Sequence, residues 1–156
     1  MDEVATKNTA VFSVVAKSPK RESQLDFIGK LADDSYCFMT LKTQKPVVSL
    51  EEAKALKSIS ANQSGASHDF LVAQGFKNLD FSLGNTGGAR KLFAGKVNAA
   101  LASRVTYRNS VKLIGKDPKD VECTGDYSRH EYWIAATRSV PPATLEKLKS
   151  AFSEIE

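Results

Sequence analysis

The sequence alternates between short apolar segments of strand length and segments with helical spacing, and this alternation constrains the fold more than any other feature. The strand-length segments lie at residues 11–16, 36–41, 58–61, 79–82, 97–102, 121–123 and 131–137. The helical patterns lie at residues 49–56, 67–74, 86–94, 105–109 and 142–156. Repeated alternation of this kind predicts an α/β fold with a largely parallel sheet and helices on both of its faces.

Several of the helix boundaries carry ordinary end signals. Ser49 is a suitable N-cap, and Glu51 and Glu52 place negative charge in the first turn, where the helix end is positive. Gly75 and Gly95 end the two helices that precede them. The last helix is expected to begin at Pro142 or Thr144 and is amphipathic, with apolar residues at Leu145, Leu148, Phe152 and Ile155.

The charge of the chain does not indicate a nucleic-acid partner. Its 156 residues include 22 basic and 18 acidic ones, which we interpret as interleaved along the whole length, and the net charge is +4. The densest basic run, residues 17–21, contains Pro19 and is followed by Glu22. A nucleic-acid site would gather basic residues on one face with aromatic residues among them, so we expect a solvated surface and no nucleic-acid partner.

Residues suited to catalysis or metal binding are few. His68 and His130 are far apart and have no adjacent nucleophile, and the CxxC, HxH and HExxH spacings of metal sites do not occur. We therefore expect no metal, no cofactor and no enzymatic activity. One enzymatic alternative stays open, a nucleophilic Cys37 or Cys123 with a histidine as base, because such partners need be adjacent only in the fold. The sequence alone leaves the two cysteines either free or paired.

Ligands of open α/β sheets bind beyond the carboxyl ends of strands, so the loops that follow strands are the first candidates for a site. Arg21 comes just after the first such loop, and its guanidinium could hold a carboxylate through two parallel hydrogen bonds. The alternative is a surface ion pair with Glu22 or Asp26, which the local pattern alone favours.

Two further loops have a composition that suits anions. The segment NQSGAS, residues 62–67, opens a helix whose free N–H groups could bind an anion, although an ordinary turn capped by Ser64 or Ser67 has the same sequence. The segment GNTGGARK lacks the spacing of a phosphate-binding GxxxxGK[ST] loop, so we expect no nucleotide there.

Five segments carry a family resemblance when they are taken together. They are VFSVVAKSPKRESQLDFIG, PVVSLEEAKAL, SISANQSGASHDFL, ARKLFAGKVNAALAS and EYWIAATRSVPPATLEKLKSAF. In their order and spacing the chain resembles the family 3 bacterial extracellular solute-binding proteins, over nearly its whole length. The resemblance implies the type II periplasmic-binding-protein fold. In that fold two α/β lobes, joined by two crossover strands, close over a small ligand, usually a polar amino acid, for delivery to an ABC importer.

The resemblance also implies how the chain divides. Residues 1–35 and 127–156 would form a partial first lobe and residues 36–126 a complete second lobe, without the signal peptide and most of the opening elements of the first lobe. The opening residues MDEVATKN lack the basic and apolar regions of a secretory signal, but the resemblance implies a periplasmic location. Cys37 and Cys123 would each lie near one crossover strand, where a disulfide could form and would support an oxidising compartment.

The ligand-binding residues implied by the resemblance fall on both lobes. They are Arg21, Ser13, Val14 and Ala16 in the first lobe and Asn62, Ala66, Ser67 and Ser103 in the second. Arg21 matches the family's carboxylate-holding Arg, whereas Ser103 stands in place of its ammonium-holding Asp. Ala16 and Ala66 stand where amino-acid-binding members often carry hydroxyls. These departures weaken the expectation of a standard α-amino acid, and Arg21 still favours an anion.

The function implied is capture of a small polar or anionic solute, amino-acid-like in kind, for an ABC importer, with the importer's permease as protein partner. The anionic end of the solute would be held by Arg21 on one lobe and by the helix-start N–H groups near Ala66 on the other. Closure of the lobes would then make both sets of contacts. The alternative is a truncated homologue with little ligand affinity. It would form a homodimer by exchange of elements or by edge pairing, with a structural or sensory role.

Overall fold

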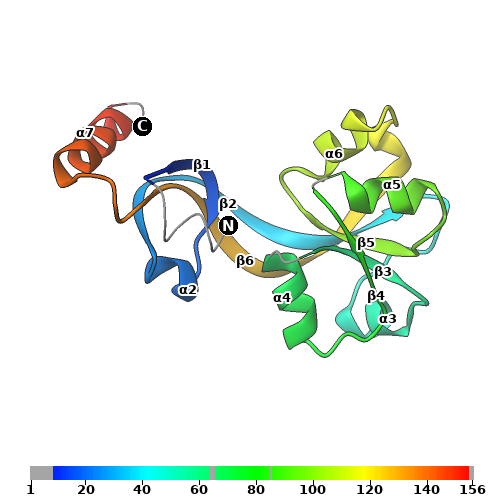
Figure 1. The fold of residues 1–156 in the computed structure, drawn as a ribbon. Coiled ribbons are helices and arrows are strands. Elements are labelled where there is room, and N and C mark those ends of the chain that lie inside the picture. The colour runs from blue at the N-terminus through cyan, green and yellow to red at the C-terminus, as the bar shows by residue number, and fades with distance from the viewer. Residues whose placement is uncertain (1–8, 64–65, 85, 155–156) are drawn as a thin grey trace. The chain divides into compact units, whose positions relative to one another are not determined.

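The structure, a computed structural model, describes residues 9–63, 66–84 and 86–154 (Figure 1). The strands are β1 (Val11–Ala16), β2 (Leu25–Leu41), β3 (Ile59–Asn62), β4 (Leu79–Ser82), β5 (Ala99–Ser103) and β6 (Val121–Thr137). The helices are α2 (Pro19–Glu22), α3 (Leu50–Ala55), α4 (Ala66–Ala73), α5 (Gly87–Phe93), α6 (Tyr107–Leu113) and α7 (Pro142–Ser153), with a 3-10 turn, η1, at Pro118–Asp120. An α/β fold is therefore confirmed.

The strands form one sheet in the order β1-β6-β2-β5-β3-β4. Strand β3 runs parallel to β4 and to β5, whereas β1 and β6 are antiparallel, as are β2 and β5. The expectation of a largely parallel sheet is therefore wrong, because the sheet is mixed. The error arose at β2 and β6, which are 17 residues long each. Only their most apolar parts, residues 36–41, 121–123 and 131–137, have the pattern of a strand.

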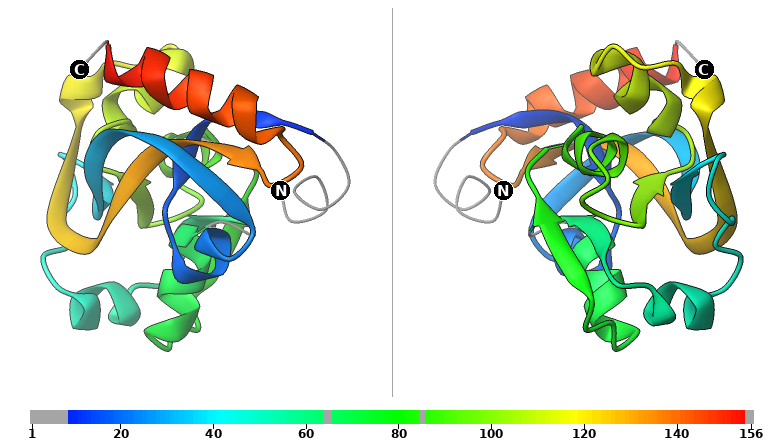
Figure 2. Two further views of the ribbon diagram at one scale, coloured as in Figure 1. Left: turned by 90° about the vertical axis from the view of Figure 1, so that its left-hand side faces the viewer. Right: turned by 90° about the vertical axis from the view of Figure 1, so that its right-hand side faces the viewer.

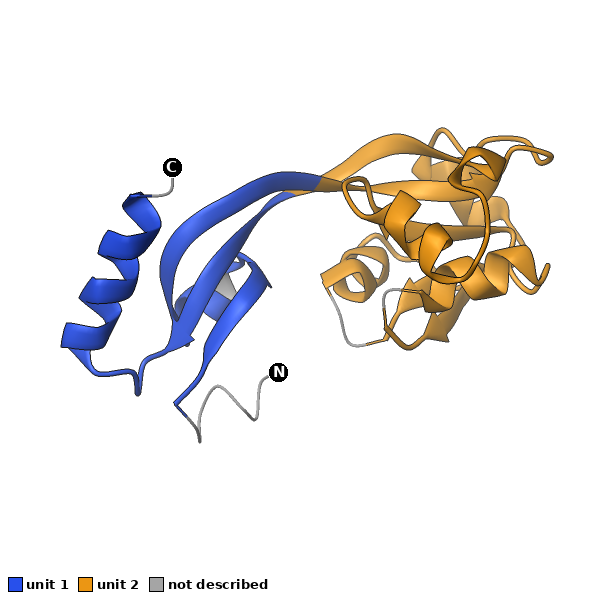
Figure 3. Ribbon diagram, turned by 90° about the horizontal axis from the view of Figure 1, so that it is seen from above, with its two compact units in different colours: residues 1–34, 130–156 blue, residues 35–129 orange. Residues whose placement is uncertain are grey.

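The chain divides into two compact units (Figure 3). Unit 1 comprises residues 1–34 and 130–156, and unit 2 comprises residues 35–129. Both divisions fall inside long strands, β2 and β6, so the chain passes from one unit to the other within the sheet.

Unit 2 has a layer of helices on each face of its strands: α5 and α6 cover one face, and α3 and α4 cover the other (Figure 1). Each layer encloses its own apolar core. The core under α3 and α4 includes the buried side chains Phe38, Val47, Ile59, Leu71 and Phe76. The core under α5 and α6 includes Met39, Leu92, Val97, Val111 and Val121. The helices on both faces that the alternation predicted are therefore confirmed for this unit.

Unit 1 has a smaller core, which centres on Val15, Leu25 and Ala135. Helix α7 lies against the strands of this unit (Figure 2), and its Phe152 ring occupies the space over Gly29 that a Cβ would fill. Of the two starts that the sequence left open, Pro142 and Thr144, the structure has Pro142. Ile155, which the helical pattern included, lies outside the described residues.

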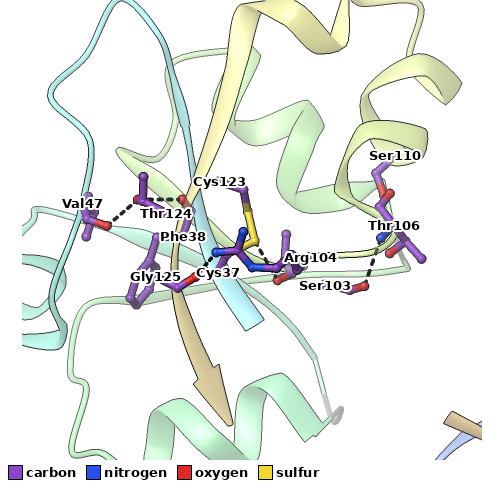
Figure 4. Close-up of a disulfide and its surroundings, with 11 residues drawn as sticks. Cys37, Phe38, Val47, Ser103, Arg104, Thr106, Ser110, Cys123, Thr124 and Gly125 are labelled. Carbon is purple, nitrogen blue, oxygen red and sulfur yellow. Dashed lines mark hydrogen bonds between the residues drawn. A yellow bond between two sulfur atoms is a disulfide. The ribbon is translucent and has the colours of Figure 1, made fainter. Parts of the chain in front are cut away.

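A disulfide joins Cys37 on β2 to Cys123 on β6, with their Cα atoms 5.3 Å apart (Figure 4). Both residues belong to unit 2. Of the alternatives that the sequence left open, the structure contains the paired form. A nucleophilic Cys37 or Cys123 is therefore wrong for this structure, because neither sulfur is a thiol.

Candidate functional site

Arg21 lies on the short helix α2, directly after β1. Its Nη1 donates a hydrogen bond to the carbonyl oxygen of Ala16 at 2.8 Å, so the guanidinium is held at the end of the strand. Glu22, one of the two acids considered as a partner for Arg21, lies 3.3 Å from the ammonium of Lys17. A guanidinium carries five N–H donors, so the bond to Ala16 leaves donors for a second acceptor such as a carboxylate.

The other unit 1 candidates lie on β1. Ser13 is exposed and Val14 is 58% exposed, whereas Ala16 is half-buried. The register of β1 against β6 shifts between Phe12 and Val15, so Ser13 and Val14 lie in an irregular part of the ladder. Irregularities of this kind redirect side chains and free backbone groups, and they are common beside binding sites.

In unit 2 the candidate residues gather at one edge of the sheet. Asn62, Ser82 and Ser103 are the last residues of β3, β4 and β5. Because β3 runs parallel to both neighbours, the carboxyl ends of these strands lie at the same edge. Ala66 and Ser67 open α4, which follows β3, and Ser67 is buried. Residues 64 and 65 of this loop, including the possible cap Ser64, lie outside the described residues.

A group of small residues that the sequence did not single out shapes this edge. Ser60 and Ser82 lie with their hydroxyl oxygens 3.2 Å apart, and the Ser82 hydroxyl donates to the carbonyl of Ala61 at 3.3 Å. A Cβ on Gly87 would lie 2.6 Å from that of Ser82, and one on Gly88 would lie 3.1 Å from that of Ala100. The adjacent glycines of GNTGGARK, Gly87 and Gly88, therefore let α5 start close to the strand ends. The sequence signal was this glycine pair, which we considered only for phosphate binding.

Ser103 has a local role at the end of β5. Its Oγ accepts a hydrogen bond from the backbone N–H of Thr106 at 3.1 Å, in the turn that leads into α6 (Figure 4). The next residue is Arg104, whose guanidinium donates a hydrogen bond to the carbonyl oxygen of Gly125. Its backbone N–H donates to the carbonyl oxygen of Ser35 at 2.9 Å. The end of β5 thus carries a hydroxyl, followed by a cation, at the place where the resembled family has its ammonium-holding Asp.

Arg104 also contributes to the charge around Asp126. A hydrogen bond from Arg129 is the largest cause that lowers the pKa of the Asp126 carboxyl, followed by one from Ser35 and by the charges of Arg129 and Arg104. Asp126 lies on β6, and its carboxylate is paired with the guanidinium of Arg129 at 2.7 Å.

The two histidines lie in different units. Nδ1 of His68 is 3.2 Å from a carboxylate oxygen of Asp69, and its ring centroid is 4.9 Å from that of Phe81. His130 is nearly buried, and its Nε2 lies 3.7 Å from the fully buried carboxylate of Asp34. Within the described ranges no three side chains of His, Cys, Asp or Glu are grouped to hold a metal ion.

The structure thus places the predicted residues in two sets. Within unit 1, Arg21 and Ala16 are in direct contact, and Ser13 and Val14 precede them on the same strand. Within unit 2, Asn62, Ala66, Ser67 and Ser103 lie at the carboxyl edge of the parallel strands.

None of the helices in the described part of the chain is long and apolar enough to cross a membrane.

No protein-family model matches the sequence, and neither does any curated protein. Solved structures do match, at low identity. A histidine kinase sensor domain with similarity to periplasmic binding proteins aligns with a TM-score of 0.80 and 18% identity, over 93% of this chain and 63% of the other. The arginine-binding protein ArgBP from T. maritima aligns with a TM-score of 0.80 and 16% identity, over 99% of this chain and 67% of the other.

A third similar structure is ArtJ from Geobacillus stearothermophilus, an arginine-, lysine-, histidine-binding protein. It aligns with a TM-score of 0.75 and 14% identity, over 90% of this chain and 61% of the other. These alignments establish a periplasmic-binding-protein-like α/β fold for the chain. The chain spans 63% of the length of the sensor domain and 61% of that of ArtJ.

Proposed function

We propose that the protein is a solute-binding protein of the family 3 type, which captures a small polar or anionic solute between two lobes. The observation that carries the proposal is the place of Arg21, whose guanidinium is anchored to the strand end by Ala16 and keeps donors for a second acceptor. The solved structures with the same fold include binding proteins for arginine, lysine and histidine, which supports a solute of amino-acid size.

The end of β5 favours an anionic solute over a standard α-amino acid. An α-amino acid brings an ammonium, which a carboxylate would hold by a charge-assisted hydrogen bond. Ser103 offers a neutral hydroxyl, and the next residue, Arg104, is a cation. Arg21 in unit 1 and the helix-start N–H groups of α4 in unit 2 would instead both attract negative charge.

The proposed setting is an oxidising compartment such as the periplasm, with an ABC importer permease as partner. Support comes from the Cys37–Cys123 disulfide, because disulfides persist in oxidising compartments and are rare in the cytosol. The sensor domain of this fold, which is described as similar to periplasmic binding proteins, supports the same setting.

Thermal unfolding with a panel of amino acids, dicarboxylates and small inorganic anions tests the proposal. A ligand that binds only the folded protein raises Tm by mass action, so a rise with one class of solute identifies it. Arg21→Ala should weaken the affinity for that solute about 100-fold, through loss of a charge-assisted pair. Arg108→Ala, at an exposed position on α6, should leave the affinity unchanged.

Ser103→Asp distinguishes the two classes of solute. The new carboxylate should strengthen binding of a solute that carries an ammonium and weaken binding of a simple anion, because like charges repel. If no solute raises Tm, or if Arg21→Ala binds the identified solute as tightly as the parent protein does, the proposed site is wrong.

A second candidate function is a homodimer with a structural or sensory role, which the edge strand β1 favours. Strand β1 lies at one end of the sheet and, among the described residues, pairs with β6 alone. Val11 and Val14 on this strand are 50% and 58% exposed. Exposed apolar edge strands readily pair with a second chain. Light scattering should then show a dimer that Val14→Lys dissociates and that Val72→Lys, at an exposed position on α4, leaves intact.

A further inference from the structure

The positive charge of the chain is concentrated in one part of unit 2. Residues 35–129 contain 14 basic and 8 acidic residues, whereas the rest of the chain contains 8 basic and 10 acidic ones. Within unit 2, residues 86–116 contain seven basic residues and no acidic one. Our interpretation of charges interleaved along the whole length is therefore wrong for this segment. It contains α5 and α6, the two helices on one face of the sheet (Figure 1).

Helix α6 and the residues beside it present a single exposed stripe, which we call the α6 stripe. Its members within the helix, Arg108, Asn109, Lys112 and Leu113, recur every three or four residues, as the helical repeat requires. Val105 and Lys116 lie just before and just after the helix, and all six residues are exposed. The opposite side of the helix packs into the core through Ser110 and Val111. Leu113 is 64% exposed and Val105 is 60% exposed, so the stripe is apolar as well as basic.

Helix α5 extends this basic surface. Arg90 on α5 and Lys96 just after it are exposed, and α5 contacts α6 directly. Two other basic residues of the segment are engaged within the protein. Lys91 lies 2.5 Å from the carboxylate of Asp80, and Arg104 donates to the carbonyl of Gly125. The surface that remains for a partner is therefore Arg90, Lys96 and the α6 stripe.

The acidic residues next to this surface do not interrupt the stripe. Asp117 follows Lys116, and its carboxylate accepts a hydrogen bond from the backbone N–H of Lys119 at 2.8 Å. Asp120 lies at the other end of η1. Both come after the last cation of the stripe, so no acidic residue falls between Arg108, Lys112 and Lys116 in the sequence.

We infer that the α6 stripe docks the protein onto an anionic phospholipid surface. Lysine and arginine attract anionic headgroups, and long aliphatic stems let their charges stay in the headgroup layer while neighbouring apolar side chains reach the acyl boundary. Leu113 and Val105 stand among the cations, where such side chains would be needed. A single exposed helix face suits a flat, deformable surface. The aromatic residues beside the stripe, Tyr107 and Phe93, are half-buried, and their rings lie 5.3 Å from Arg108 and 5.8 Å from Lys116. Among the described residues beside the stripe, no fully exposed ring is thus left for a base to stack on, which argues against single-stranded nucleic acid.

Co-sedimentation with lipid vesicles tests the inference on the whole chain. The protein should bind vesicles of phosphatidylglycerol and phosphatidylcholine, bind vesicles of phosphatidylcholine alone far more weakly, and be released from the former by salt. Lys112→Gln with Lys116→Gln should lower the partition coefficient about 25-fold, since each basic residue near an anionic surface contributes about fivefold. Leu113→Ser should lower it about fivefold through loss of the apolar contact.

The matched control removes the same charge from the opposite face. Lys57 and Lys77, which follow α3 and α4, are exposed, so Lys57→Gln with Lys77→Gln should change the partition coefficient by less than about threefold. Equal losses in the two double variants would mean attraction by net charge alone and would overturn the inference. Failure to bind phosphatidylglycerol vesicles would also overturn it, and would leave an acidic protein surface as the partner to seek.

Discussion

Gly125 in β6 occupies a position at which any other residue type is strained. Its φ is +84°, in the left-handed region, and an added Cβ would overlap the ring of Tyr127. That ring cannot move away cheaply. Its centroid is 5.3 Å from that of Phe38 in the core, and its hydroxyl donates to the carbonyl of Val48 at 3.1 Å. Gly125 therefore satisfies a backbone and a packing requirement at once.

We predict that Gly125→Ala lowers the free energy of unfolding by roughly 3 kcal/mol, from backbone strain together with displacement of the Tyr127 ring. Gly75 provides the matched control, because its φ is +80° and no atom lies within 4 Å of the Cβ position. Gly75→Ala should cost only about 1 kcal/mol, from backbone strain alone. Urea denaturation of both variants measures the difference, and equal costs would show that Tyr127 moves aside freely.

The residues of the candidate site could be predicted only in part, for physical reasons. Arg21 was identifiable because a cation after a strand is a local feature of the sequence. Its bond to Ala16 was not, because it depends on the path of the chain through α2. The packing of Gly87 against Ser82 joins residues of separate elements. No local pattern distinguishes glycines that serve such packing from those of an ordinary turn.

At the scale of elements, the start of α3 shows how several weak signals act together. The Ser49 hydroxyl accepts from the backbone N–H of Glu52 at 3.1 Å, so the predicted N-cap is confirmed. The Glu52 carboxylate in turn accepts from the backbone N–H of Val48 at 2.9 Å and pairs with Lys45 at 2.9 Å. The hydrogen bond from Val48 is the largest cause that lowers the pKa of Glu52, followed by that from Lys45.

We predict that Ser49→Ala lowers the free energy of unfolding by about 1 kcal/mol, the usual cost of removing an N-cap. The contribution of the Glu52 carboxylate to the free energy of unfolding should depend on pH. Because the pKa of Glu52 is lowered in the folded protein, this contribution is fully present above the ordinary pKa of 4.5 and is lost as the pH falls through the lowered pKa. Carboxyl NMR titration measures that pKa, and a midpoint at or above 4.5 would contradict the prediction. Unfolding of Glu52→Gln should lack this part of the pH dependence.

The long strands show where prediction of elements from sequence stops. The short strands β1 and β4 are predicted to the residue, because each is a short segment that contains apolar residues and ends before a loop rich in polar residues, proline or glycine. Strand β2 is found only in its last part, residues 36–41, and β6 only in two pieces, residues 121–123 and 131–137. The missed parts carry acidic residues and glycines, which resemble a loop locally. They are strands because neighbouring strands supply hydrogen bonds, an influence of tertiary structure that outweighs local propensity.

At the scale of the whole molecule, the disulfide closes a loop that contains nearly all of unit 2. Cys37 and Cys123 are separated by 86 residues, and unit 2 spans residues 35–129. A cross-link over a loop of this length restricts the unfolded chain strongly, and loop-closure entropy gives a stabilisation of roughly 4–5 kcal/mol. Unit 1 lies outside the closed loop, so this stabilisation should belong to unit 2.

We therefore predict that reduction lowers the free energy of unfolding of unit 2 by about 4 kcal/mol and affects unit 1 less. The single tryptophan, Trp133, lies in unit 1, in edge-to-face contact with Phe27 at 5.9 Å, so its fluorescence follows that unit. Circular dichroism follows the helices, most of which belong to unit 2 among those described.

In urea, reductant should move the dichroism midpoint more than the fluorescence midpoint. Cys37→Ala with Cys123→Ala should respond to reductant in neither signal, because it has no bond to reduce. Equal movement of both midpoints in the parent protein would show instead that the two units unfold together, as one cooperative body joined through β2 and β6.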